Sequence, residues 1–183
     1  MVTAVLDEAT AYEWDRLATA LNGYGIDYLA PHKRVRRRPS SGVELFELLA
    51  RAKSVRLQEG FTTLLLLHPE MADAAQQAID CLEGDIRTRA TRRYVAAAAL
   101  QRMWWTRLRT ELGTVLKIPE AYLAELELSD IDRDFGETAL LEMSNREEEI
   151  YGYDAWNGYN SLMELFLSHY CNTWKKRSRA RSG

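Results

Sequence analysis

Residues 85–112 constrain the fold most, because their apolar side chains recur at the spacing of an α-helix rather than of a strand. At 100° per residue, five of them fall within about 20° of one line along a helix: Ile86, Ala90, Ala97, Trp104 and Leu108. An unbroken helix of about 28 residues would be about 42 Å long. Alanine occupies residues 96–99, so we expect a neighbouring helix to approach closely there. The stretch predicts one long central helix.

Helical spacing also dominates the remainder, and β-branched runs that alternate every second residue are nearly absent. The sequence therefore predicts an all-α fold, with a single globular domain of about six to eight helices over residues 1–174. An irregular basic connection is expected over residues 24–42, and a disordered basic tail over residues 175–183. The predicted helices span about residues 7–21, 43–52, 54–67, 69–83, 85–112, 119–126, 135–145 and 161–174.

Three of these helices begin with the pattern Ser/Thr-x-x-Glu, in which a hydroxyl and a carboxylate cap the free backbone N–H groups of the first turn. The pattern occurs at Thr10, Ser41 and Ser161. Asn22-Gly23 predicts the end of the first helix, since both residue types adopt the left-handed conformation readily.

The composition is typical of a globular domain, with 46% apolar and 28% charged residues in a chain of 183. A domain of this size buries about 70% of its unfolded surface and needs no structural metal or disulfide. Cys81 and Cys171 are too few for a disulfide-built secreted domain, so we expect two reduced thiols. The acidic N-terminus does not resemble a signal peptide, and no apolar run approaches the length of a membrane span. These features predict a cytoplasmic protein without membrane contact.

Charge is sorted along the chain into blocks of opposite sign, although the formal net charge is only −3. Residues 32–38 and residues 171–183 each carry +5, and residues 84–110 carry +6. The acidic counterpart is residues 111–170, with a net charge of −11. Segregation of this kind predicts a surface that contacts charged partners, although it names no reaction.

The connection and the tail hold ten cations in two short runs, which are the predicted binding residues. Dense exposed cations neutralise phosphates and release counterions, which gives salt-sensitive binding without sequence preference. An acidic protein partner would be recognised in the same way, and a solvated loop and tail that bind nothing are the third interpretation. The residues are Lys33, Arg34, Arg36, Arg37, Arg38, Lys175, Lys176, Arg177, Arg179 and Arg181.

The arginines of residues 84–110 would form a binding stripe only if they shared one face of the helix. On a helical projection they instead flank the apolar line on both sides. Ion pairs within the molecule, and aliphatic stems that lie over the core, explain this distribution. Gln101 lies about 40° from the apolar line and is expected to be a hydrogen-bonded amide in the core.

Residues 130–142 come close to the pattern of a calcium-binding loop. Such a loop requires glycine at its sixth position and glutamate at its twelfth, whereas Gly136 and Glu142 are each one place late. Asp134-x-x-Glu137 is instead typical of a helix N-terminus, where the helix dipole favours carboxylates. No histidine or cysteine pair has the spacing of metal ligands, so the sequence predicts no metal and no cofactor.

Four aromatic residues precede the last predicted helix: Tyr151, Tyr153, Trp156 and Tyr159. Stacked bases or a protein partner would suit such a patch, since aromatic residues contribute strongly to both kinds of interface. The simpler interpretation is that these side chains cover the core and keep their polar atoms in water.

No catalytic motif of a known class is recognisable in the chain. The sequence therefore predicts a non-enzymatic binding or accessory protein, whose basic segments contact nucleic acid or a nucleoprotein complex and whose acidic C-terminal third faces a protein partner. A second hypothesis is a self-assembling protein or an antitoxin-like partner or complex subunit, without nucleic-acid contact. A third is an enzyme that uses dispersed carboxylates such as Glu142, Glu147, Glu148 and Glu149. No small-molecule substrate is evident.

Overall fold

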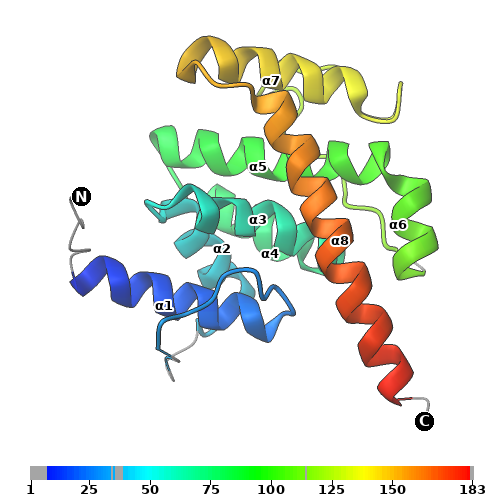
Figure 1. The fold of residues 1–183 in the computed structure, drawn as a ribbon. Coiled ribbons are helices and arrows are strands. Elements are labelled where there is room, and N and C mark those ends of the chain that lie inside the picture. Colours follow the sequence, from blue (N-terminus) through cyan, green and yellow to red (C-terminus); the bar gives the residue numbers. More distant parts are fainter. Residues whose placement is uncertain (1–7, 34, 36–38, 114, 182–183) are drawn as a thin grey trace.

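A computed structural model describes residues 8–33, 35, 39–113 and 115–181 (Figure 1). Over these residues the chain forms eight α-helices, one 3-10 helix and no strand, which confirms the predicted all-α fold. One hydrophobic core draws residues from all eight helices. In chain order the elements are α1 (Glu8–Gly23), α2 (Gly42–Arg51), α3 (Val55–Leu67), η1 (Pro69–Met71), α4 (Ala72–Asp80), α5 (Gly84–Met103), α6 (Trp105–Leu112), α7 (Glu137–Tyr151) and α8 (Ala155–Arg181).

The side chains of residues 8–10, 151 and 170–181 lie outside the description, although their backbone is part of it. No helix in the described ranges is both long and apolar enough to cross a membrane. Cys81 is an exposed free thiol that follows α4, whereas the side chain of Cys171 is among those outside the description.

The first four helices have bounds close to those predicted, and they pack as one layer of the core. α2 contacts α3 and α4, and α1 contacts α3. A Cβ at Gly60 of α3 would lie 2.8 Å from Leu21 Cδ1 of α1. The missing side chain of this glycine therefore allows α1 and α3 to approach each other.

The start of α2 follows the capping pattern that predicted it. Ser41 Oγ accepts a hydrogen bond from the Glu44 backbone N–H at 3.1 Å, as expected of an N-cap residue. The Glu44 carboxylate reaches one residue further back than predicted, and accepts from the N–H and the hydroxyl of Ser40, both at 2.6 Å. It also pairs with Arg16 of α1 at 2.5 Å, so the cap joins two helices.

The long central helix predicted over residues 85–112 is wrong in one respect, because two helices, α5 and α6, occupy this stretch. At Trp104 the backbone ψ is 14°, far from the helical value of about −42°. As a result α6 leaves the axis of α5 at a steep angle (Figure 1). Neither proline nor glycine marks this break. Its reason is tertiary, because α5 packs against α3 and α7 whereas α6 packs against α8.

The connection between α6 and α7 contains turns but no helix over its described residues, so the helix predicted over residues 119–126 is wrong. Tyr122 has a φ of 65°, a left-handed conformation that interrupts a helix. Its hydroxyl donates to the Gln76 carbonyl of α4 at 3.3 Å, and its ring packs edge-on against Tyr94 of α5 at 5.6 Å. These contacts fasten the connection to both helices and decide its backbone.

α7 lies against α5, and the residue that precedes α7 approaches Ala99, the last of the four alanines of residues 96–99. Gly136 precedes α7 with a φ of 86°, and a Cβ at this position would lie 2.7 Å from the Ala99 carbonyl oxygen. A glycine is therefore needed both for the left-handed backbone and for the close contact. The N-cap residue of α7 is Gly136, which makes no side-chain cap bond, and not Asp134 as predicted. The Asp134 carboxylate, two residues earlier, accepts from the Thr138 N–H at 3.2 Å.

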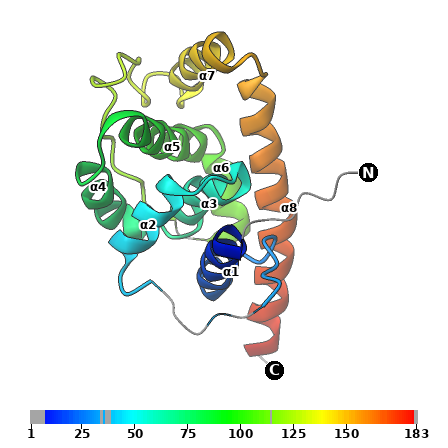
Figure 2. The same ribbon diagram turned by 90° about the vertical axis from the view of Figure 1, so that its left-hand side faces the viewer.

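Both ends of α8 differ from the predicted bounds. The helix begins at Ala155 because the Asp154 carboxylate caps it by accepting from the Asn157 N–H at 2.9 Å, so Ser161 lies inside the helix and is not its cap. At the other end α8 continues to Arg181, so residues 175–181 form its last turns instead of a separate tail. Figures 1 and 2 show α8 running along one side of the molecule, from α7 past α5 and α6 to the level of α1 and beyond.

Candidate functional site

The predicted basic connection is fastened to α1 by a buried carboxylate. Asp15 accepts hydrogen bonds from the backbone N–H groups of His32 and Lys33 at 2.7 and 3.1 Å, and its Oδ1 lies 3.1 Å from His32 Nδ1. Burial would raise the pKa of Asp15, but the hydrogen bonds from His32 and Lys33 outweigh it and lower the pKa. The carboxylate therefore remains charged and holds the start of residues 32–38 against α1. Further along, the Val35 N–H donates to Thr19 Oγ1 at 3.4 Å.

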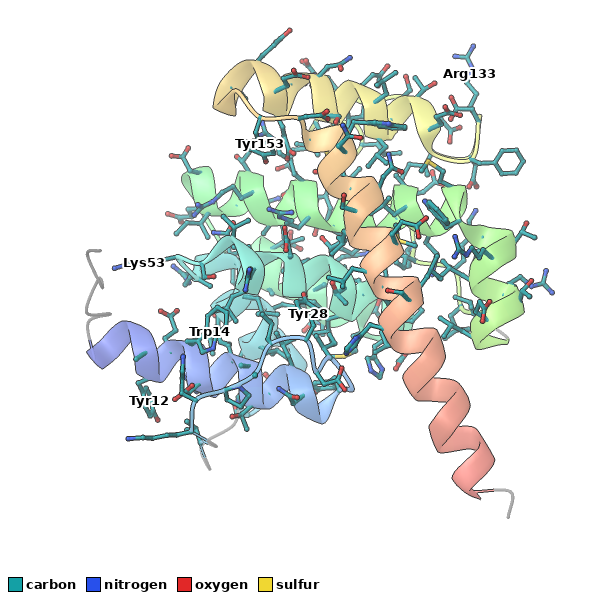
Figure 3. The ribbon with its side chains drawn as sticks, viewed as in Figure 1. Tyr12, Trp14, Tyr28, Lys53, Arg133 and Tyr153 are labelled. Atoms are coloured by element: carbon teal, nitrogen blue, oxygen red, sulfur yellow. The ribbon has the colours of Figure 1, made fainter. Side chains whose placement is uncertain are left out.

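The first part of the connection, residues 24–31, packs into the core. Ile26 and Leu29 are fully buried. The Tyr28 hydroxyl lies 3.5 Å from Thr63 Oγ1 of α3, and Figure 3 labels this tyrosine above α1. Residues 24–31 are thus packed against the core, and the basic residues 32–38 follow them directly in the chain.

An ion pair joins this connection to α8. His169 Nε2 lies 2.6 Å from Asp27 Oδ1, and both side chains are partly exposed. The basic residues 175–181 follow His169 in the same helix. Figure 2 shows the connection after α1 beside the C-terminal half of α8. The start of residues 32–38 and the last turns of α8 therefore lie at the same end of the molecule, opposite α7.

This basic end comprises both segments that carry the predicted binding residues. Lys33 has a described side chain, which is exposed. Arg34, Arg36, Arg37 and Arg38 lie outside the described residues. On α8 the backbone is described for five further cations, whose side chains lie outside the description: Lys175, Lys176, Arg177, Arg179 and Arg181.

Several arginines of α5 and α6, in contrast, pair within the molecule, as predicted for this stretch. Three of them each reach a carboxylate of residues 111–170. Three positive charges of residues 84–110 are therefore paired with negative charges of residues 111–170 inside the molecule. The pairs are Arg87–Glu125 at 3.1 Å, Arg102–Asp132 at 3.1 Å and Arg107–Glu164 at 3.6 Å.

The most enclosed of these pairs is at Arg102, which is buried. Its guanidinium donates to Asp132 Oδ1, Gln101 Oε1 and the Ile118 carbonyl at 3.1, 2.9 and 2.7 Å. Gln101 also accepts from the Ile118 N–H at 2.8 Å and donates to the Leu116 carbonyl at 2.9 Å. These contacts confirm Gln101 as a hydrogen-bonded core amide, and they bind the connection after α6 to α5.

Sequence reasoning missed this network, although Arg102 was correctly placed beside the apolar line. Lys117 also contacts Asp132, and the hydrogen bonds from Lys117 and Arg102 lower the pKa of the Asp132 carboxyl. Burial and the neighbouring Asp132 charge raise the pKa of Glu120. The partners come from an irregular segment whose path no periodicity predicts, so the pairing had no signal in the sequence.

Three of the four predicted interface aromatics have described side chains, and these differ in burial. Tyr159 is buried and donates to Glu147 at 3.0 Å, and burial raises its pKa far above the usual range. Trp156 is half-buried against the core. Tyr153 is exposed (Figure 3), with its hydroxyl 3.5 Å from the same carboxylate, and the side chain of Tyr151 lies outside the description. Tyr159 and Trp156 thus pack in or against the core, in agreement with the interpretation that these side chains cover it.

The carboxylates considered for catalysis point to separate partners. Glu142 accepts from the hydroxyl and the N–H of Ser129 at 2.7 and 2.8 Å, and these bonds lower its pKa. Glu147 is buried and contacts the hydroxyls of Tyr153 and Tyr159, whereas Glu148 and Glu149 are exposed. Within the described ranges, no three His, Cys, Asp or Glu side chains are grouped so that they could hold a metal ion.

The candidate functional site is therefore the basic end, which the Asp15 contacts and the His169–Asp27 pair hold in place. The chain was also compared with known proteins. No model of a protein family matches it, and neither a curated protein nor a solved structure matches it significantly.

Proposed function

We propose that this protein is a non-enzymatic accessory protein that contacts the backbone of a nucleic acid, alone or in a nucleoprotein complex, through its basic end. The observation that carries the proposal is the His169–Asp27 pair, since it ties α8 to the connection that leads into residues 32–38. Ten cations would then face one phosphate backbone together. Two separate basic runs become one contact surface in this arrangement.

The charge on the rest of the chain supports an oriented mode of binding. The two basic segments carry +5 each, so the formal net charge of −3 leaves −13 on all other residues. A body of this charge repels a polyanion, and steering would turn the basic end toward the phosphates. The arginines of α5 and α6 contribute little, because carboxylates of the same molecule already pair with three of them.

In this proposal the opposite, acidic end faces a protein partner. Phe135, just before α7, leaves 75% of its surface exposed. Leu141 is also exposed, as are Glu148 and Glu149 of the same helix. An exposed aromatic among carboxylates suits a partner surface that combines apolar and basic residues.

A second candidate function is self-assembly, in which the basic end of one copy contacts the acidic end of another. The charge difference between two parts of the chain favours it, because residues 111–170 carry −11 and residues 171–183 carry +5. Self-assembly would dissociate with salt and would show no affinity for nucleic acid. Sedimentation velocity at two salt concentrations separates it from the first proposal.

Fluorescence anisotropy tests the first proposal directly, with labelled RNA, single-stranded DNA and duplex DNA at low and moderate salt. We expect binding to all three that weakens with salt, with a slope of roughly −0.9 per phosphate contacted on duplex DNA. Replacing the five cations of either segment by glutamine should remove roughly half of that slope. Absence of binding at low salt would overturn the proposal.

A matched control neutralises five other cations, so that the change in net charge is the same. All five are exposed: Arg51, Lys53, Arg56, Arg109 and Arg133. We expect this variant to bind almost as the unaltered protein does. An equal loss of binding in the control would mean that total charge, and not the basic end, determines the affinity.

A further inference from the structure

A pocket of about 210 Å³ lies at the junction of α5, α7 and the turn over residues 125–128. Its apolar wall comes from Leu126, Leu128 and Met143. Thr88 and Arg92 contribute from α5, one helical turn apart. Arg146 contributes from α7, so two arginines from different helices share one pocket.

Arg92 differs from Arg87 and Arg102 of the same helix in its contacts. Its side chain is half-buried, and among the described residues neither an ion pair nor a hydrogen bond holds its guanidinium. Arg87 and Arg102, in contrast, each bind a carboxylate. A guanidinium that is partly removed from water and lacks a counterion favours an anion beside it.

Arg146 binds the backbone of the turn over residues 125–128, which forms one side of the pocket. Its guanidinium donates to the carbonyls of Leu126 and Glu127, the latter at 2.9 Å. Glu127 has a φ of 52°, a left-handed conformation that is unfavourable for a residue with a side chain. Strained backbone that a side chain holds in place is found at ligand-binding segments. The two carbonyls are neutral acceptors, and the Glu142 carboxylate of the same helix interacts with the charge of Arg146.

Two glutamates also line the pocket and reduce its positive charge. Glu125 is bound by Arg87 at 3.1 Å, and Glu127 is exposed to water. Arg87 lies outside the lining and pairs with Asp80 as well as Glu125, so the two arginines and two glutamates that line the pocket leave a formal charge of zero. A site with no net positive charge suits a monoanion better than a dianionic phosphate.

We propose that this pocket binds a small carboxylate that carries a short apolar group. The carboxylate would lie between Arg92 and Arg146, and the apolar group would lie against the two leucines and Met143. The volume equals that of about seven water molecules and is below the range of drug-sized pockets. This site is separate from the basic end and does not depend on the function proposed above.

Titration followed by two-dimensional ¹H–¹⁵N NMR tests the site with named probes. Hexanoate represents a free fatty carboxylate, and N-acetyl-leucine represents the carboxyl end of a peptide. We expect saturable shifts at the amides of Thr88, Leu126, Leu128 and Arg146 with at least one of them. Hexanol and N-acetyl-leucinamide, which lack the charge, and inorganic phosphate should each bind at least tenfold more weakly. Equal binding of hexanol or of phosphate would overturn the carboxylate assignment.

Substitutions then test the arginine. Arg92→Gln should weaken binding of the better carboxylate at least tenfold, whereas Arg89→Gln, on the same helix but outside the pocket, should not change it. Thr88→Glu places a competing carboxylate in the pocket at an exposed position and should abolish binding, while Thr88→Gln retains it. Unchanged binding in Arg92→Gln or in Thr88→Glu would overturn the site. Nucleic-acid affinity serves as a separate readout and should stay the same in all four variants.

Discussion

The two kinds of basic region in this molecule are similar in charge and differ in what the fold supplies around them. The arginines of α5 and α6 are covered by the acidic residues 111–170, which fold back over them and pair with three of them. Residues 32–38 also begin beside a carboxylate, but among the described residues Asp15 binds backbone N–H groups and an imidazole and no guanidinium. From this comparison we expect a run of cations to act as a binding surface only where no acidic segment of the same chain pairs with it.

The largest effect on stability should come from removing the ion pair and hydrogen bonds of Arg102. Arg102→Ala removes a buried guanidinium, which deprives the Ile118 carbonyl of its donor and removes one of the donors to Gln101 Oε1 and to Asp132. We expect the free energy of unfolding to fall by about 3 kcal/mol in urea denaturation. Arg109→Ala, on exposed α6, is the control and should change it by less than about 0.5 kcal/mol. A small loss in Arg102→Ala would show that the acidic segment is held by other contacts.

The packing of the acidic region on α5 gives the next largest effect. Gly136→Ala forces a side chain into the left-handed backbone and against the Ala99 carbonyl, so we expect a loss of about 2–3 kcal/mol in unfolding free energy. Gly158→Ala is the matched change inside α8, where a Cβ meets nothing within 4 Å. It should be neutral or stabilising by up to about 1 kcal/mol. Equal effects of the two substitutions would argue against a close α5–α7 contact.

At the basic end, substitution of Asp15 should lower the free energy of unfolding more than substitution of the cations of residues 32–38 does. Asp15→Asn weakens three charge-assisted contacts to the connection, and we expect a loss of about 2 kcal/mol in unfolding free energy at pH 7. Glu13→Gln, in the same helix, is the control and should change it little. A comparable loss in both variants would mean that the charge of α1, and not the contacts of Asp15, is responsible.

The pH dependence of the same substitution sharpens the test. Because the pKa of Asp15 is lowered in the folded protein, its contribution is present above the unfolded value of about 3.9 and disappears as the pH falls through the folded value. The difference between the unaltered protein and Asp15→Asn should therefore stay constant from about pH 7 to pH 5 and shrink below about pH 4. A difference that persists at about pH 2 would contradict the lowered pKa.

The smallest effect on stability is expected from the cations themselves. Replacing Lys33, Arg34, Arg36, Arg37 and Arg38 by glutamine should change the free energy of unfolding by no more than about 0.5 kcal/mol, while nucleic-acid affinity falls. Thermal unfolding and anisotropy on the same samples measure both. A large loss of stability would mean that these residues, like those of α5, are matched inside the molecule.

Several local features of the fold were readable from the sequence because they depend on neighbouring residues. Ser41 caps α2 through the Glu44 N–H, and Asn22-Gly23 predicted the end of α1, although the left-handed residue there is Gly25. The alanines of residues 96–99 predicted the close approach of a helix, and the residue that approaches Ala99 is Gly136, which directly precedes α7. The internal pairing of the α5 arginines also followed, from their place on both sides of the apolar line.

The features that sequence reasoning missed are those that distant contacts decide. Trp104 breaks the long helix without proline or glycine, because α6 turns to pack on α8. Tyr122 is left-handed because its side chain is held by α4 and α5, which removes the helix expected over residues 119–126. Asp154 caps α8 ahead of Ser161, although both positions carry residues that can cap a helix.

By itself the sequence determined the helical class, most helix bounds in the first half of the chain, and the sorting of charge into blocks, because these depend on spacing and composition. The tertiary structure alone decided which charges meet. Arg102 is paired because an irregular segment returns to it, and the connection after α1 lies beside α8 because Asp27 contacts His169 across 142 positions of chain. Coulombic partners are chosen by distance in space, which periodicity along the chain does not encode.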